Sequence, residues 1–322
     1  MLQQVLSSSV LRRIAGALGT LVGVAIAVFV MLRAIPGDEI TAAYGTEAAA
    51  LTDEQRAALE RYYGMDQPLL VQFFTWIGEL LSGNFGYSAR AEASVVELTV
   101  ASLPVTVELA VLSIILAVLI GLPLGMLSAS KPDSLRDWLG QGVALGGLGI
   151  PTFLLGAALL TITARAGFNP NGLGYARPWE NPVLNLQQMI IPSLVLGFAI
   201  AAPIMRTTRT AVLEVREQDF IRTARAKGVP LRRLQRHHVL RNALIPIVTM
   251  TGMQFGFLLG GAVVIEQIFS LPGIGRQVLL GINQQEYAVV QSSVLIIALM
   301  FVLVNLATDL VYGKIDPRVG VQ

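Results

Sequence analysis

The sequence predicts an all-α integral membrane protein with six membrane-spanning helices and a helical domain outside the membrane, between the first and second spans. Three observations lead to this fold class. Hydrophobic residues make up 54% of the 322 residues and charged residues only 14%, whereas an ordinary soluble domain has about 25% charged residues. The apolar residues gather in runs close to the roughly 20 residues that cross a bilayer as a helix. The remaining charged residues are divided unequally between the two faces that these runs define.

Six apolar runs are long enough to span a bilayer. They are Ile14–Leu32, Pro104–Ser128, Trp138–Thr163, Met189–Met205, Ile245–Ile265 and Val289–Val311. The first run follows two arginines, as a secretory signal would, but it exceeds the roughly 7–15 residues usual there and no small-residue cleavage pattern follows. We therefore expect an uncleaved span. Glu108 and Asp309 lie near run ends, where interfacial hydrogen bonding is a simpler expectation than a proton relay.

The distribution of Lys and Arg predicts the orientation of the chain. The N-terminal tail, the 129–137 and 206–244 connections and the C-terminal tail contain sixteen Lys and Arg against six Asp and Glu, and the opposite face contains seven against thirteen. Because cytoplasmic loops are enriched in Lys and Arg, both termini are expected in the cytoplasm. This asymmetry explains the basic residues without a nucleic-acid partner. The absence of cysteine excludes disulfides and thiolate metal sites.

Residues 36–103, with three basic and ten acidic residues, are expected to form the extracytoplasmic helical domain. Thr52 and Gln55 have the spacing of a capping box, and Gly64 stands where a glycine would end that helix. A second helix is expected between Pro68 and Gly83. Its apolar residues at helical spacing are Leu69, Leu70, Phe73, Phe74, Ile77, Leu80 and Leu81, with Trp76 beside the two Phe. This helix either lies at the outer membrane interface, packs on a partner domain, or covers its own apolar face.

The connection between the fourth and fifth spans, Arg206–Leu244, contains ten Lys and Arg, three acids and both histidines. Asp219 is placed to cap a short helix that Gly228 ends, and Pro230 to begin a second helix. The apolar faces predicted for these helices consist of Phe220, Ile221 and Ala224 in the first, and of Leu231, Leu234 and His238 in the second. Helices this short need a surface to dock on, which is either a partner or the chain's own span ends and the lipid headgroups. The adjacent histidines make a poor metal site, because neighbouring helix positions point about 100° apart.

The residues of this connection resemble the coupling loop of permease subunits in bacterial ABC importers. The matching residues read Thr223-Ala224-Arg225-Ala226-Lys227-Gly228 and His238-Val239-Leu240-Arg241-Asn242-Ala243-Leu244-Ile245-Pro246. More narrowly, they are similar to the first, B-type, permease of the dipeptide/oligopeptide/nickel branch. The general family pattern has Glu at the position of Arg222 and Pro at that of Arg241, and the departures here resemble the version of the peptide branch.

Further segments resemble the same family along nearly the whole chain. They are Ile35-Pro36-Gly37-Asp38, Gly64 to Pro68, Leu103 to Ala110, Gly149 to Phe153, Phe269 to Arg276, Val304 to Asp309 and Asp316 to Arg318. This resemblance implies a type I ABC-importer permease fold, with a cytoplasmic N-terminus and first helix over 1–35, the outer domain over 36–103 and a core permease domain over 104–322.

The resemblance also implies the function and the partners. The expected protein is a multi-pass permease of the bacterial inner membrane that imports peptides, with a second homologous permease, two cytosolic ATPases or a fused one, and an extracytoplasmic binding protein. The chain has no Gly-x-x-x-x-Gly-Lys-Ser/Thr loop, so ATP and Mg²⁺ are expected on the ATPase partners. We expect no catalytic, cofactor or metal site in this chain. The alternative class is a secondary transporter or channel that acts alone.

The resemblance assigns site residues to three places. ATPase coupling is expected at Asp219, Phe220, Ile221, Arg222, Thr223, Ala224, Arg225, Ala226, Lys227, Gly228 and Pro230, and the junction with the fifth span at His238, Leu240, Arg241, Asn242 and Pro246. Arg276, in the outer Pro-Gly-Ile-Gly segment, is a candidate contact for the binding protein.

Polar and helix-breaking residues within the third and fifth runs are candidates for the transport pathway. They are Gly149, Pro151, Thr249, Thr251 and Gln254. Polar groups at bilayer depth usually face a bundle interior or a cavity. The alternative, that they form hydrogen bonds between packed helices, stays open for each of them.

Overall fold

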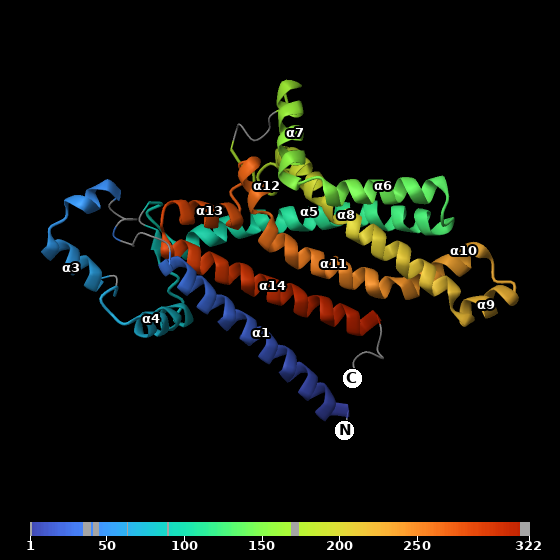
Figure 1. The fold of residues 1–322 in the computed structure, drawn as a ribbon, viewed down its shortest axis with the longest axis horizontal. Coiled ribbons are helices and arrows are strands. Elements are labelled where there is room, and N and C mark those ends of the chain that lie inside the picture. Colours follow the sequence, from blue (N-terminus) through green and yellow to red (C-terminus); the bar gives the residue numbers. More distant parts are fainter. Residues whose placement is uncertain are drawn as a thin grey trace. The chain divides into compact units, whose positions relative to one another are not determined.

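The computed structural model describes residues 2–34, 40, 45–62, 64–88, 90–168 and 174–315, and these are almost entirely helical (Figure 1). The described residues include one two-stranded antiparallel sheet, in which Tyr87 of β1 (Tyr87–Ser88) pairs with Ser94 of β2 (Ala93–Ser94). The chain forms two compact units. One contains residues 10–106 and 272–300, and the other contains residues 1–9, 107–271 and 301–322.

The first unit contains most of the N-terminal third of the chain. Its helices are α1 (Leu2–Ala34) from residue 10 onward, η1 (Gly45–Ala50), α3 (Asp53–Tyr62), α4 (Leu69–Leu81), the first turns of α5 (Val95–Ser130), α13 (Ile274–Asn283) and the first half of α14 (Tyr287–Ile315). Tyr287 and Val290 of α14 pack against Val28 and Leu32 of α1.

The two helices predicted outside the membrane are present with the expected ends. The backbone N–H of Gln55 donates to Thr52 Oγ1 over 3.3 Å, and that of Thr52 donates to Gln55 Oε1 over 3.0 Å, so the capping box of α3 is confirmed. Gly64 and Gly83 follow α3 and α4 with φ of 67° and 88°, the left-handed conformation that glycine adopts without a steric cost.

The second unit is arranged around α8 (Pro182–Glu217). Its other helices are α5 from residue 107 onward, α6 (Leu135–Gly149), α7 (Thr152–Arg165), α9 (Asp219–Ala226), α10 (Leu231–Arg233), η3 (Leu234–Leu240), α11 (Arg241–Gly261), α12 (Val263–Ile268) and the second half of α14. α6 and α11 pack along α8, and α7 contacts it at an angle (Figure 1). Two thirds of the most apolar stretch of α8 is buried, far more than in the other spanning helices, so α8 is the central helix of this unit.

Five helical segments are long and apolar enough to cross a membrane. They are Ile14–Ala34, Val95–Ser130, Pro182–Glu217, Leu231–Gly260 and Tyr287–Thr308. A sixth span is possible only if α6 and α7, which are bent by 94° at their junction, cross together. The third predicted run, Trp138–Thr163, is therefore not one straight helix. Pro151 explains the break, because proline has no N–H to donate and restricts the residue before it to extended conformations.

The other predicted runs also differ from the observed helices at their ends, and α8 and α11 show this most clearly. α8 continues beyond Met189–Met205 in both directions, because Asn181 caps its first turn and polar residues such as Asn185 and Thr208 are buried within it. The fifth run, Ile245–Ile265, starts after the helix does, and α11 ends at Gly261 so that Ile265 belongs to α12. An apolar run marks the part suited to hydrocarbon, and helices extend beyond it at the interfaces.

Candidate functional site

The connection between α8 and α11 is largely helical. Residues 206–217, predicted as part of the connection, belong to α8. Gln218 separates α8 from α9, and residues 227–230 separate α9 from α10. The predicted helix–glycine–helix is therefore confirmed as α9, a turn at Gly228, and a second helical segment from Leu231 onward.

The start of α9 differs from the prediction. Gln218 occupies the N-cap position and makes no capping hydrogen bond, so Asp219 is the first residue of the helix and not its cap. Its carboxylate lies 3.5 Å from Arg222 Nη1, and both side chains are largely exposed. An acid in the first turn still interacts favourably with the helix dipole, which makes Asp219 a helix-stabilising residue.

The end of α9 is set by Gly228. Its φ is 77°, its N–H donates to the carbonyl of Arg225 over 3.0 Å, and the N–H of Val229 donates to the carbonyl of Ala224 over 3.2 Å. These are the two hydrogen bonds of a Schellman motif. A Cβ on Gly228 would meet nothing within 4 Å, so the backbone conformation, and not lack of space, requires glycine here.

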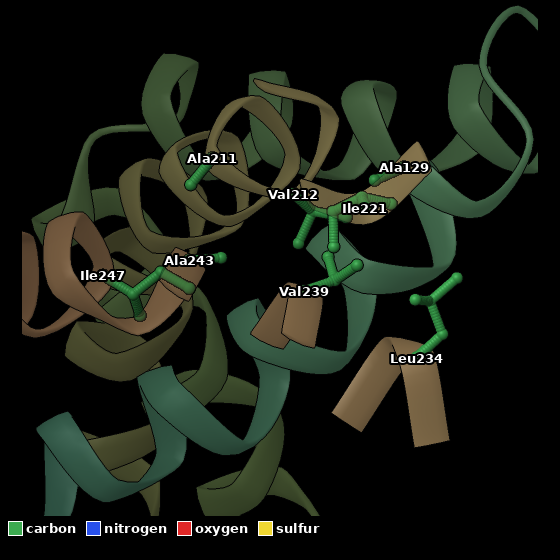
Figure 2. Packing of buried hydrophobic residues seen from close by; sticks show 8 residues of the cluster. All are labelled: Ala129, Ala211, Val212, Ile221, Leu234, Val239, Ala243 and Ile247. Atoms are coloured by element: carbon green, nitrogen blue, oxygen red, sulfur yellow. The ribbon is translucent and has the colours of Figure 1, made fainter. Parts of the chain in front are cut away.

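One face of this helical pair is buried in a cluster that we call the platform. Its buried residues are Ala129, Ala211, Val212, Ile221, Leu234, Val239, Ala243 and Ile247, with Ala224 and Val229 packed against them. Figure 2 shows Ile221 of α9 and Val239 of η3 directed toward Val212 of α8. Because burying each of these aliphatic side chains contributes about 1.5–3 kcal/mol, α9 and η3 are fixed to the adjoining ends of α5, α8 and α11.

Two of the apolar residues predicted for these faces are exposed. Phe220 is 44% exposed and Leu231 is 69% exposed. Ile221 and Leu234, predicted on the same two faces, are buried as members of the platform. The exposed surface of the connection therefore combines two large apolar side chains with the exposed cations Arg222, Arg225 and Lys227.

The junction residues lie on a continuous helical path into α11. His238 and Leu240 belong to η3, which has the wider π-helical hydrogen bonding, and Arg241 and Asn242 open α11. The side chain of Asn242 donates to the carbonyl of His238 over 2.6 Å. Pro246 lies within α11 and not at its start. Leu240 also lines a cavity of about 150 Å³ between α5, α8 and η3, together with Val212, Arg216 and Val239.

A buried ion pair beside the platform was not identified from the sequence. Arg209 Nε donates to Asp137 Oδ1 over 2.8 Å, and Arg209 Nη2 donates to Oδ2 over 2.7 Å. Ser128, Gln141 and the backbone N–H of Asp133 also donate to the same carboxylate. The pair thus joins the end of α5, the first turn of α6 and α8. The sequence signal was Asp137, an acid one residue before a predicted span.

The pathway candidates of α11 are partly buried and engaged with their own helix. Thr249 Oγ1 donates to the carbonyl of Ile245 over 3.1 Å, and Thr251 Oγ1 donates to that of Ile247 over 2.8 Å. Gln254 is half-buried. Gly149 and Pro151 are exposed at the bend between α6 and α7. Lining of a pathway by these residues stays a prediction.

Arg276 and Glu108 lie in different units. Arg276 lies in the first turn of α13 and is half-buried, and its role toward a binding protein stays a prediction. Glu108 accepts a hydrogen bond from Tyr175 Oη over 2.7 Å, and Asn185 donates to the same hydroxyl over 3.2 Å. Burial and the neighbouring Glu108 both raise the pKa of Tyr175 above its ordinary value. The hydrogen bond from Tyr175 confirms the expectation that Glu108 is hydrogen-bonded.

Three segments used for the family resemblance are only partly testable by geometry. Ile35 to Asp38 and Asp316 to Arg318 lie outside the described residues, as does the side chain of Asp309. Within the described part of the chain, no three His, Cys, Asp or Glu side chains form a group that could hold a metal ion.

Comparison with known proteins gives two matching family models. The model described as "Binding-protein-dependent transport system inner membrane component" matches residues 121–321, and the one described as "Binding-prot-dependent transport system membrane comp, N-term" matches residues 6–110. Together they account for most of the chain.

Similar full-length proteins come from enteric bacteria. The glutathione transport system permease protein GsiC of Salmonella typhimurium is 40% identical over 312 residues, and that of Escherichia coli is 36% identical over 311 residues. Each alignment covers 96% of this chain and 98% of the relative. A solved structure titled "Crystal structure of an amino acid ABC transporter with histidines" has 17% identity and a TM-score of 0.48, covering 69% of this chain and 94% of that one.

Proposed function

The chain belongs to the family of binding-protein-dependent transport system inner membrane components, and we propose that it imports peptides by coupling ATPase closure to its spans through α9. Membership makes it an inner-membrane permease subunit of an ABC importer and not itself an enzyme. This membership argues against the alternative class, a secondary transporter or channel that acts alone.

Peptides are the proposed substrate class because the similar permeases are named for the transport of glutathione, which is itself a tripeptide. Uptake of labelled glutathione and of unmodified di- and tripeptides by the assembled transporter in vesicles tests this. Uptake of peptides supports the proposal. Uptake of a metal ion or a non-peptide solute, with none of the peptides competing, overturns it.

The proposed assembly contains this chain, a second homologous permease, two ATPase subunits or a fused one, and an extracytoplasmic binding protein. Both termini face the cytoplasm, and ATP with Mg²⁺ is held by the ATPase partners. Copurification tests the assembly directly. Recovery of this chain without ATPase or second permease, under conditions that keep the membrane complex intact, would contradict it.

Coupling is supported by one observation above the others, the packing of Ile221 on the platform. The exposed side of α9 and α10 presents Phe220 and Leu231 to an ATPase groove. When the ATPases close, α9 moves with them. Because Ile221, Leu234 and Val239 are fixed against α8 and α11, the cytoplasmic ends of those helices move with α9.

Substitutions on the two sides of α9 separate docking from transmission. Phe220→Ala and Leu231→Ala are expected to weaken ATPase binding by about 10-fold or more, since each buried side chain is worth about 1.5–3 kcal/mol. They are expected to leave thermal stability unchanged, because both side chains are exposed in this chain. Ile221→Ala, by contrast, is expected to cost about 2–5 kcal/mol of stability and to raise the ATP hydrolysed per substrate transported.

Phe153→Ala serves as the matched control, because Phe153 is exposed to a similar degree on α7. Binding constants, thermal midpoints and transport stoichiometry are measured on the same purified complexes. Coupling through α9 is wrong if Phe220→Ala and Leu231→Ala bind ATPase and couple transport as the unchanged protein does.

The pathway and the binding-protein contact are proposed with separate tests. Cysteines placed at Thr251 and Gln254 are expected to react with aqueous probes in at least one nucleotide state, and lack of reaction in every state rules out lining. Arg276→Glu is expected to weaken binding-protein docking without changing ATPase binding.

A further inference from the structure

Helix α4, outside the membrane spans, has three distinct faces. It contains one charged residue, Glu79, among thirteen. At about 100° per residue, its side chains divide into a face packed on α1, an exposed apolar stripe and a polar strip. The proposed coupling and transport functions use none of these.

The packed face fixes α4 to the last turns of α1. The ring of Phe29 on α1 lies 5.2 Å from that of Phe73, edge to face, and 5.9 Å from that of Trp76, stacked. Arg33 Nε donates to Gln72 Oε1 over 2.9 Å. These contacts place α4 at the level where the first membrane span ends, since the candidate span runs to Ala34.

The exposed apolar stripe consists of Leu70, Phe74 and Leu81. They are 74%, 68% and 85% exposed, and their positions fall within about 40° of one another around the helix. Three neighbouring large apolar side chains with exposed fractions this high are unusual on a surface that faces water. Something apolar is therefore expected to cover it.

The exposed side of α1 indicates what covers the stripe. Val30 and Met31, in the last turns of the span, are 58% and 61% exposed, and they belong to a helix that crosses the bilayer. The stripe on α4 lies on a helix packed against these same turns. The polar strip, with Thr75 and Glu79, is on the other side of α4 and is exposed as well.

We propose that α4 lies in the outer interface of the bilayer, with Leu70, Phe74 and Leu81 inserted among the lipid headgroups and upper acyl chains and with Thr75 and Glu79 facing water. An interfacial helix has this arrangement of one apolar and one polar side, with Phe and Leu among the residues typical of the apolar side. The helix then anchors the outer domain at the end of the first span.

The alternative cover is the extracytoplasmic binding protein. Such a partner docks and leaves in each transport cycle, so between cycles the stripe would face water. The bilayer is present throughout, and it already adjoins the turns of α1 on which α4 packs. The lipid surface therefore explains both the composition of the stripe and its position.

The cysteine-free sequence allows a direct depth measurement. Single variants Leu70→Cys, Phe74→Cys and Leu81→Cys probe the stripe, and Thr75→Cys and Glu79→Cys are matched controls from the same helix. Each is labelled with a small fluorophore in the assembled transporter, after accessible cysteines of the partner subunits have been replaced by serine, in nanodiscs of phosphatidylethanolamine and phosphatidylglycerol. ATP hydrolysis by each labelled complex verifies that it is folded.

Two quenchers separate the possible covers. Lipids with a nitroxide near the headgroup are expected to quench the stripe labels several-fold more than the control labels, and aqueous iodide is expected to show the reverse order. Equal iodide quenching of stripe and control labels overturns the proposal. So does protection from iodide without quenching by lipid, or protection that appears only when the binding protein is added, because each indicates water or protein at the stripe.

Discussion

Gly228 illustrates how a single residue sets the geometry of the connection between α8 and α11. Its positive φ ends α9 and turns the chain toward α10. Gly228→Ala is expected to destabilise this turn by about 1–2 kcal/mol. In the left-handed region a Cβ comes too close to the carbonyl oxygen that follows it in the same stretch of backbone, even where no other residue is near. We expect more ATP hydrolysed per peptide transported. Gly228→Asn is expected to have a stability between those of the unchanged protein and Gly228→Ala, since Asn tolerates this conformation better than Ala does.

Gly142→Ala is the control for this substitution, because Gly142 lies within α6 and a Cβ there also meets nothing within 4 Å. Its φ is ordinary, so alanine is expected to be neutral or slightly stabilising there. Transport stoichiometry and thermal unfolding of both variants provide the measurement. An equal effect of the two alanines would show that backbone conformation at Gly228 does not matter.

The ion pair of Asp137 and Arg209 makes a second residue-scale prediction. The side chain of Asp137 is 1% exposed and that of Arg209 is 23% exposed. Asp137→Ala leaves the guanidinium without its carboxylate in a buried site, and we expect a loss of about 3–5 kcal/mol in the free energy of unfolding. Denaturant unfolding of the purified permease in detergent measures it.

The double variant Asp137→Ala with Arg209→Ala tests whether the two side chains act as a pair. Removing the second charge is expected to recover part of the loss, because no uncompensated charge remains. Asp133→Asn is the control for loss of a nearby charge alone, since Asp133 donates to Asp137 through its backbone N–H and its carboxylate acts on Arg209 only through a longer-range electrostatic interaction. Strict additivity of the two alanine substitutions would contradict a coupled pair.

Local signals at single residues predicted some of these features and missed others. Thr52 with Gln55 and Gly228 were predictable because capping and positive φ depend on the chain within a few residues. The exposure of Phe220 and Leu231 was not, since it depends on which face the platform covers. The partner of Asp137 was equally hidden, because Arg209 is far away in sequence.

At the scale of helices, close packing of α11 against the second half of α14 depends on small residues. A Cβ on Gly252 would clash with Cγ2 and Oγ1 of Thr308. Gly252→Ala therefore forces the helices apart, and we expect a loss of about 1–3 kcal/mol, as for other overpacked sites. Denaturant unfolding in detergent and the transport rate are the measurements.

Gly260→Ala on the same helix is the matched control, because a Cβ there meets nothing within 4 Å. Thr308→Ala combined with Gly252→Ala is expected to recover part of the loss, since it removes the nearest atoms. If Gly252→Ala and Gly260→Ala behave alike, α11 and α14 do not approach as closely as described.

Helix ends were the least predictable elements. Hydropathy located the apolar centre of α8 but not its extension to Glu217, because the added turns are polar and are stabilised by packing. Pro151 did signal the interruption of the third run, since a missing N–H is a local property. The size of the resulting bend, 94°, depends on how α6 and α7 pack on α8 and is not present in the sequence pattern.

At the scale of the whole molecule, the bend between α6 and α7 leaves two possible topologies. If the pair crosses the membrane, the chain has six spans. The connection before α6 and the connection between α7 and α8 then lie on opposite sides of the membrane. If the pair enters and leaves on one side, the chain has five spans, and α9 lies on the outside with the ten Lys and Arg of residues 206–244. The second arrangement violates the enrichment of Lys and Arg in cytoplasmic loops, so we expect the first.

Single cysteines in this cysteine-free chain distinguish the two topologies in intact cells. Ser134→Cys precedes α6, Glu180→Cys follows α7, and Lys227→Cys follows α9; Glu54→Cys in the outer domain is the control for access. A membrane-impermeant maleimide is expected to label positions 54 and 180 in intact cells, and positions 134 and 227 only after permeabilisation. Labelling of 227 but not 180 in intact cells would make the bent pair re-entrant. It would also place α9 on the side opposite to ATP, so the coupling proposed for Phe220 and Leu231 would fail with the six-span topology.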